Sequence, residues 1–115
     1  MSTLKVNTIQ NTSGVEVYTA KAWVNFNGTG TVAIRAAGNV SSITDNGTGD
    51  YTLNFTNAMP DANYVFVCSQ GGGNNYIART YEDLTPRTAS AIRFVMLNAS
   101  FNTADPAHVN VTIFR

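Results

Sequence analysis

Apolar and polar residues alternate along the stretch Tyr51-Thr52-Leu53-Asn54-Phe55-Thr56 and again from Ala107 to Phe114. An alternation with a period of two residues is typical of a β-strand that buries one face. The residues predicted to point inward are Tyr51, Leu53 and Phe55 in the first stretch and Val109, Val111 and Ile113 in the second. Both stretches therefore predict strands, and the fold class that they indicate is all-β.

Further strands of this kind are expected at intervals of about ten residues along the chain. Turn residues separate them, and the pairs Asn27-Gly28 and Asn46-Gly47 are the strongest hairpin signals. No long window keeps the 3.6-residue period of a helix. We therefore expect an antiparallel β-sandwich or jelly-roll-like domain, with its other strands over residues 21–26, 31–36, 40–44, 63–69, 76–81 and 90–97.

The expected strand over residues 90–97 has an unusual outer face. Arg93, Val95 and Leu97 point outward if Ile92 and Phe94 point inward. Because this outer face is too apolar for open water, we expect another part of the protein to cover some of it.

The run from Asp45 to Asp50 has two interpretations. Its acidic and amide side chains resemble a calcium-binding loop, but glycines stand where alternate ligands belong and no downstream Glu completes the set. The tetrapeptide Asn-Gly-Thr-Gly occurs here and again at residues 27–30, where it also suits a turn. Hairpin turns are therefore favoured at both places.

The first 20 residues differ from the rest of the chain. Residues 4–9 and 15–18 are expected to be strands, with a turn between them at residues 11–14. Because a lone two-stranded hairpin is marginally stable in water, this hairpin or extended arm is expected to pair with its own domain or with a neighbouring subunit. We interpret residues 1–20 as an attachment and oligomerisation segment and residues 21–115 as the β-sandwich domain. The apolar residues assigned to attachment are Leu4, Val6, Ile9, Val15 and Val17.

Composition excludes several classes of function. The chain has 115 residues, and its seven basic and seven acidic side chains cancel. It therefore lacks the basic footprint of a nucleic-acid-binding protein, and it has no apolar run long enough to span a membrane. A single cysteine, Cys68, excludes an intrachain disulfide framework and a thiolate-rich metal site. We expect no cofactor, no metal, no nucleic-acid partner and no membrane insertion.

The residues that carry chemistry do not form a catalytic set. The one histidine, His108, falls on the outer face of the last strand, and Cys68 falls in a predicted core strand. The adjacent acids Glu82 and Asp83 are expected in a solvated loop, and Asp105 beside Pro106 is typical of a turn. The sequence therefore predicts a binding or structural protein rather than an enzyme.

The scarcity of lysine points to self-association. Soluble β proteins usually protect open sheet edges with lysines, prolines or bulges. This chain has only two lysines, Lys5 and Lys21, although it has 14 Asn and 15 Thr. We therefore expect identical copies to occupy the open edges, most simply in a homotrimer.

Several stretches resemble a module of bacteriophage and prophage tail-fibre-like proteins, of the kind found in cyanophages and marine phages. The resemblance covers roughly the first 64 residues, and its opening residues are Leu4-Lys5-Val6-Asn7-Thr8-Ile9-Gln10. It implies a non-enzymatic virion protein that is often trimeric, made in the host cytoplasm and displayed outside the particle. The stretches that carry it are Lys21-Ala22-Trp23-Val24-Asn25-Phe26-Asn27-Gly28-Thr29-Gly30-Thr31-Val32-Ala33-Ile34-Arg35, residues 38–51 and Ala58-Met59-Pro60-Asp61-Ala62-Asn63-Tyr64.

The position of this module differs from the usual pattern, in which it ends a long shaft. Here about 20 residues precede it, and they reach about 66 Å when fully extended at ~3.3 Å per residue. We therefore expect a short tail fibre or knob close to the particle, held by tail or baseplate proteins. The alternatives are a capsid decoration (cement) protein on the major capsid protein and a bacterial lectin-like binding module.

A host surface glycan is the expected ligand of the exposed loops, because aromatic rings stack on sugars and amides supply hydrogen-bond donors and acceptors. The alternative for the two aromatic candidates is that they pack in the core. The candidate contact residues are Asn74, Asn75 and Tyr76 beside the triple glycine, and Phe101 with Asn102 in the loop over residues 98–106.

Overall fold

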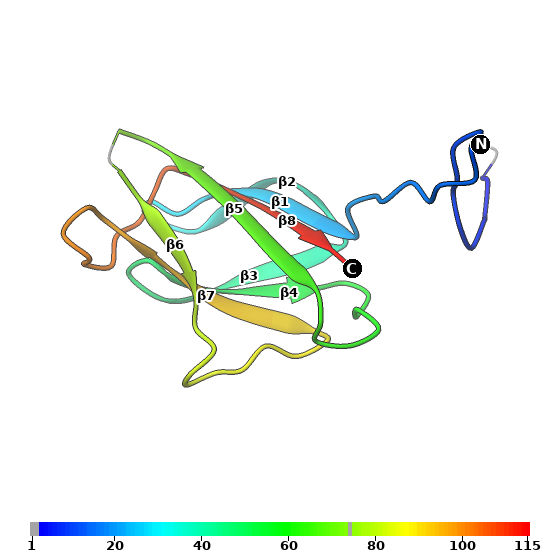
Figure 1. The fold of residues 1–115 in the computed structure, drawn as a ribbon. Helices are drawn as coiled ribbons and strands as arrows, with labels where there is room; N and C mark the ends of the chain where they lie inside the picture. The colour runs from blue at the N-terminus through cyan, green and yellow to red at the C-terminus, as the bar shows by residue number, and fades with distance from the viewer. Residues whose placement is uncertain (1–2, 74) are drawn as a thin grey trace.

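The computed structural model describes residues 3–73 and 75–115, which form two four-stranded antiparallel sheets (Figure 1). In the β1 sheet the strand order is β2 (Ala33–Gly38), β1 (Ala22–Asn27), β8 (His108–Phe114) and β5 (Val65–Gly71). In the β4 sheet the order is β3 (Val40–Gly47), β4 (Asp50–Phe55), β7 (Ala91–Leu97) and β6 (Ile77–Thr80). The described residues include no helix long and apolar enough to cross a membrane.

The core lies between the two sheets and consists of the inward-facing residues of both. Tyr51, Leu53 and Phe55 of β4 are buried, and so are the alternate valines and isoleucine of β8. The rings of Phe26 and Tyr51 meet edge to face, with centroids 5.1 Å apart, and so join β1 to the opposite sheet. The all-β fold and its sandwich-like layering are therefore confirmed, because the alternation of residues decides which face of each strand is buried.

The hairpin interpretation of the Asn-Gly pairs agrees with the structure. β3 and β4 pair as neighbours, but the turn between them falls on Thr48 and Gly49, just after the Asn46-Gly47 pair, and Gly49 has a positive φ angle of 66°. Asp45 accepts the backbone N–H of Gly47 at 3.0 Å, whereas Asp50 pairs with Arg93. Asp45 and Asp50, at the ends of the run that resembles a calcium loop, therefore each bond a different partner. The bond from Gly47 N–H to Asp45 is a common one in turns.

The strands predicted in the N-terminal segment are wrong within the described residues. Residues 3–20 contain a turn at residues 11–14 and one isolated bridge between Gln10 and Glu16, but no strand. The segment leaves the domain at Lys21, whose N–H bonds the Ile113 carbonyl at 2.8 Å, and extends away from both sheets (Figure 1). Two extended segments with nothing packed on them bury too little surface to hold a regular β-ladder.

The outer face of β7 is partly covered, as the sequence predicts. Val95 is only 6% exposed. Beside it, the Arg93 guanidinium makes two bonds to the Asp50 carboxylate, at 2.9 and 2.6 Å, and lies 4.8 Å from the centre of the Tyr81 ring. This bidentate pair and the residues after β6 shield one side of the β4 sheet from water.

One carboxylate oxygen links the loops at one end of the sandwich. Asp105 Oδ1, in the β7–β8 connection, accepts a hydrogen bond from the Tyr51 hydroxyl at 2.7 Å and another from the Gly49 N–H at 2.6 Å. Burial raises the pKa of the Tyr51 phenol, so the hydroxyl remains a neutral donor. Gly49 is required because a Cβ there would lie 2.6 Å from the Ala104 backbone.

Removing the Tyr51 hydroxyl tests the importance of this link. The Tyr51→Phe variant is expected to lose about 1.5–3 kcal/mol of unfolding free energy, because a hydrogen bond to a charged acceptor is lost in a partly buried place. Urea unfolding followed by circular dichroism measures the change. Tyr18→Phe, at an exposed tyrosine, is the control and should change nothing. Equal stability of Tyr51→Phe and the parent would contradict the role given to the link.

The ion pairs predict how stability depends on pH. Hydrogen bonds from Arg93 lower the pKa of Asp50, and those from Arg115 lower the pKa of Asp61 to about 2. A carboxyl whose pKa is lower in the folded state stabilises the fold above its unfolded pKa of about 4, and that contribution is lost as the pH falls toward 2. The melting temperature should therefore fall between pH 4 and pH 2. The melting temperature of the Asp50→Asn variant should fall less steeply with decreasing pH than that of the parent. Identical slopes of melting temperature against pH would contradict this.

Candidate functional site

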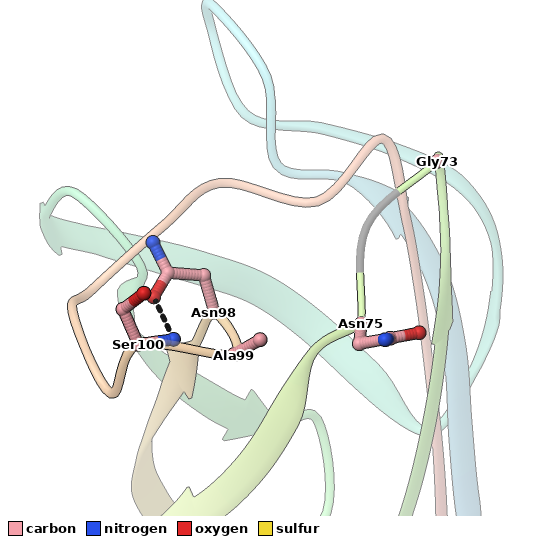
Figure 2. A pocket seen from close by; sticks show the side chains of 5 residues that line it. All are labelled: Gly73, Asn75, Asn98, Ala99 and Ser100. Atoms are coloured by element: carbon pink, nitrogen blue, oxygen red, sulfur yellow. Dashed lines mark hydrogen bonds between the residues drawn. The ribbon is translucent and has the colours of Figure 1, made fainter.

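Two loops meet at one end of the sandwich and enclose a shallow hollow. One loop joins β5 to β6 and the other joins β7 to β8, and Figure 2 shows their side chains around it. The hollow has a volume of about 370 Å³. We call it the loop-tip pocket, and its lining residues are Gly73, Asn75, Asn98, Ala99 and Ser100.

Asn98 holds the β7–β8 loop in shape. Its side-chain oxygen accepts the backbone N–H groups of Ser100 at 2.9 Å and of Asn102 at 3.1 Å, and the first of these bonds is drawn in Figure 2. Its own N–H bonds the Asn102 carbonyl at 2.8 Å. The shape of this pocket wall is thus fixed by Asn98, whose side-chain oxygen accepts backbone N–H groups in place of a backbone carbonyl. This is a common role of Asn in turns.

Phe101 projects from this loop into solvent. Its side chain is 72% exposed and its φ angle is 63°, in the left-handed region that costs a residue with a side chain about 1–2 kcal/mol. The alternative interpretation, in which this ring packs in the core, is therefore wrong. Local hydrogen bonds of the loop hold the residue in this conformation, because Phe101 N–H bonds the Asn98 carbonyl at 2.9 Å.

The other predicted contact residues occupy different environments. Asn75 is exposed and lines the loop-tip pocket, and Asn102 is exposed in the opposite loop. Tyr76 is half-buried and packs against the core, as the alternative interpretation expects. Asn74 lies outside the described residues. Sequence reasoning did not select Asn98, although an Asn followed two residues later by Ser is a recognisable turn signal.

The residues considered for catalysis lie apart from this pocket or have other partners. Burial raises the pKa of the Cys68 thiol to about 12, so the thiol stays protonated at neutral pH. Glu82 pairs with Arg87 at 2.6 Å. Within residues 3–73 and 75–115 no three His, Cys, Asp or Glu side chains come together in a way that could hold a metal ion.

The chemistry of the loop-tip pocket is neutral. Residues with amide and hydroxyl side chains line it, none of its described lining residues is charged, and the exposed Phe101 ring stands in the β7–β8 loop. Such groups offer both donors and acceptors of hydrogen bonds. The pocket is therefore suited to an uncharged, hydroxyl-rich ligand.

The N-terminal segment forms the second exposed feature, at the opposite end of the molecule from the two loops (Figure 1). Its apolar side chains are between 45% and 85% exposed. The five predicted attachment residues belong to this set, namely Leu4, Val6, Ile9, Val15 and Val17. Apolar side chains this exposed, gathered in one segment, are typical of a surface that meets a partner.

The chain matches no protein-family model, no curated protein and no solved structure. Its own structure defines a class, an antiparallel two-sheet β protein with a neutral loop-tip pocket at one end and an exposed apolar segment at the other.

Replacing Phe101 tests the strain in the loop. Phe101→Gly is expected to raise the free energy of unfolding by roughly 0.5–1 kcal/mol, since relief of the left-handed conformation outweighs the extra freedom that glycine has in the unfolded chain. Denaturant unfolding measures the change. Leu84→Gly is the control, because Leu84 is also exposed but has no positive φ, and this variant should not be stabilised. A destabilised Phe101→Gly would show that the ring contributes to folding.

Proposed function

We propose that this chain is a structural protein of a bacteriophage virion, a short tail fibre or knob displayed on the outside of the particle. In this proposal it is a homotrimer of jelly-roll-like sandwiches and catalyses no reaction. The observation that carries the proposal is the placement of the exposed apolar segment and the loop-tip pocket at opposite ends of a molecule 48 Å long (Figure 1). One end attaches, and the other faces outward.

The N-terminal segment supplies the attachment. Full burial of one Val, Leu or Ile side chain contributes roughly 1.5–3 kcal/mol. The five attachment residues are 45–85% exposed, so burying what they still expose offers on the order of 4–9 kcal/mol before the cost of ordering the segment is subtracted. The partners proposed for them are sister chains and proteins of the tail or baseplate.

The loop-tip pocket supplies the contact with the host. Asn75 and Asn98 line the pocket from the two loops, and Phe101 offers an exposed ring in the same loop as Asn98. Amides bond sugar hydroxyls and a ring stacks on the apolar face of a sugar. The proposed ligand is a neutral glycan of the host surface.

The sheet edges support a trimer. The four edge strands are β2, β3, β5 and β6, and their sequences contain neither lysine nor proline. β2 and β3 are protected by β-bulges, whereas β5 has an unbroken register and no charged residue, and an edge strand of that kind pairs readily with other chains. Sister chains that cover this edge would remove that hazard.

Capsid decoration is the second candidate function. It is favoured by the outer face of the β1 sheet, where Trp23, Val65 and Val67 are exposed. A broad apolar side suits a protein that lies flat on a shell of capsid proteins.

Separated heads and tails of purified virions test the location. Mass spectrometry is expected to find this chain with the tails in a few copies. Many copies on the heads would establish capsid decoration instead, and sugar binding by the pure protein without its presence in virions would establish a lectin-like module. Phages that carry Phe101→Ala are expected to incorporate the protein normally and to adsorb to host cells at least about tenfold more slowly, whereas Leu84→Ala phages adsorb normally.

A further inference from the structure

The outer face of the β1 sheet carries a group of exposed apolar side chains that belong to three neighbouring strands. Thr112 of β8 stands between Trp23 of β1 and Val67 of β5 in the register of the sheet, and Val65 lies opposite Phe114. Neighbouring strands are about 4.8 Å apart, so these side chains lie side by side. We call this group the outer patch. Its members are between 38% and 56% exposed and comprise Trp23, Val65, Val67 and Phe114.

The outer patch is not covered as the other sheet is. On the β4 sheet, Arg93 with its partners Asp50 and Tyr81 shields the outer face. Around the outer patch Asn25, Ser69, Asn110 and Thr112 are uncharged. In the described part of the chain, the one cation bonded to them is Arg35 of β2, which donates to Asn25 Oδ1 at 3.2 Å on the side of the patch away from β5. A neutral apolar surface favours an occupant that is also neutral and apolar.

The N-terminal segment has the matching chemistry. At the bridge between Gln10 and Glu16 these two side chains share one side of the ribbon, so that their neighbours Ile9, Val15 and Val17 share the other. The hydrogen bonds from Asn11 to Val15 and from Val17 to Ile9 join residues of the segment to each other and leave that apolar side open.

The starting point of the segment places it beside the outer patch. Lys21 N–H bonds the carbonyl of Ile113, the residue before Phe114, so the segment leaves the sheet at the edge of the patch. The last residues of the segment, Val17 included, line a hollow with Phe114 and Arg115 of the same chain, and the residues before them run away from the domain (Figure 1). A segment that continues outward meets the face of a neighbouring copy, whereas binding its own face requires a reversal of the chain.

We propose that the N-terminal segment of one copy packs on the outer patch of a second copy, with Ile9, Val15 and Val17 against Trp23, Val67 and Phe114. This packing buries two apolar surfaces that a single copy leaves in water. In a closed ring of copies, every N-terminal segment packs on the outer patch of the next copy, so no segment and no patch stays exposed. This inference rests on the self-association in the proposed function but not on a virion location, so purified protein tests it separately.

Charge-bearing variants of the full chain test the contact by sedimentation or light scattering at micromolar concentration. The parent is expected to associate. Val17→Lys and Val67→Glu, each alone, are expected to raise the dissociation constant at least about tenfold, because each places an unpaired charge in an apolar contact. Leu84→Glu is the matched control, since Leu84 is 75% exposed in the β6–β7 connection, outside the sheet edges and the outer patch, and it should associate as the parent does.

Mixing the two variants distinguishes a contact between copies from one within a copy. An equimolar mixture of Val17→Lys and Val67→Glu is expected to recover part of the association. Each contact between unlike copies is either unaltered or pairs opposite charges, and only a contact between like copies keeps an unpaired charge. No recovery, association of Val67→Glu equal to that of the parent, or a monomeric parent would each overturn the proposal. Circular dichroism confirms folding of each variant, and Val65→Glu replaces Val67→Glu should the latter not fold. The virion location is unaffected by any of these results.

Discussion

The acceptance of two hydrogen bonds by Asp105 Oδ1 is the interaction on which one end of this protein depends. Its donors are the Tyr51 hydroxyl, from the middle of the core, and the Gly49 N–H, from the turn between β3 and β4. The same aspartate belongs to the β7–β8 connection, whose earlier part forms a wall of the loop-tip pocket. The aromatic core, a hairpin turn and the pocket loop are thus tied to a single carboxylate, so the pocket loop is anchored to the buried core of the molecule.

Local patterns predicted the strands well because side-chain alternation is a local property. The residues of β4 and β8 alternate between polar and apolar types, and the structure buries the apolar ones. The link through Asp105 was not predictable, since its partner Tyr51 is 54 residues away and Asp105 itself indicates only a turn. Phe101 was also ambiguous, because an aromatic residue in a loop fits both core and surface until its backbone conformation is known.

Other features depend on what surrounds a segment. Residues 4–7 alternate as a strand does, yet the structure leaves them without a ladder, because a strand also needs a covering layer. The two outer sheet faces show the same dependence. The face with Arg93 and Asp50 is shielded by the chain itself, and the face with Trp23 is left open. In the proposed assembly, the N-terminal segment of one copy covers the open outer face of the β1 sheet of the next copy.

The pairing of β1 with β8 also constrains how the chain reaches its folded state. β8 lies between β1 and β5, so the β1 sheet has no centre until residues 108–114 are available. Contacts between residues this distant in sequence form slowly, because a long loop must close first. During synthesis on the ribosome, β5 therefore has no neighbour in its sheet, and β1 has only β2, until residues 108–114 have emerged. Until then the unpaired edges of these strands are a natural target for chaperones.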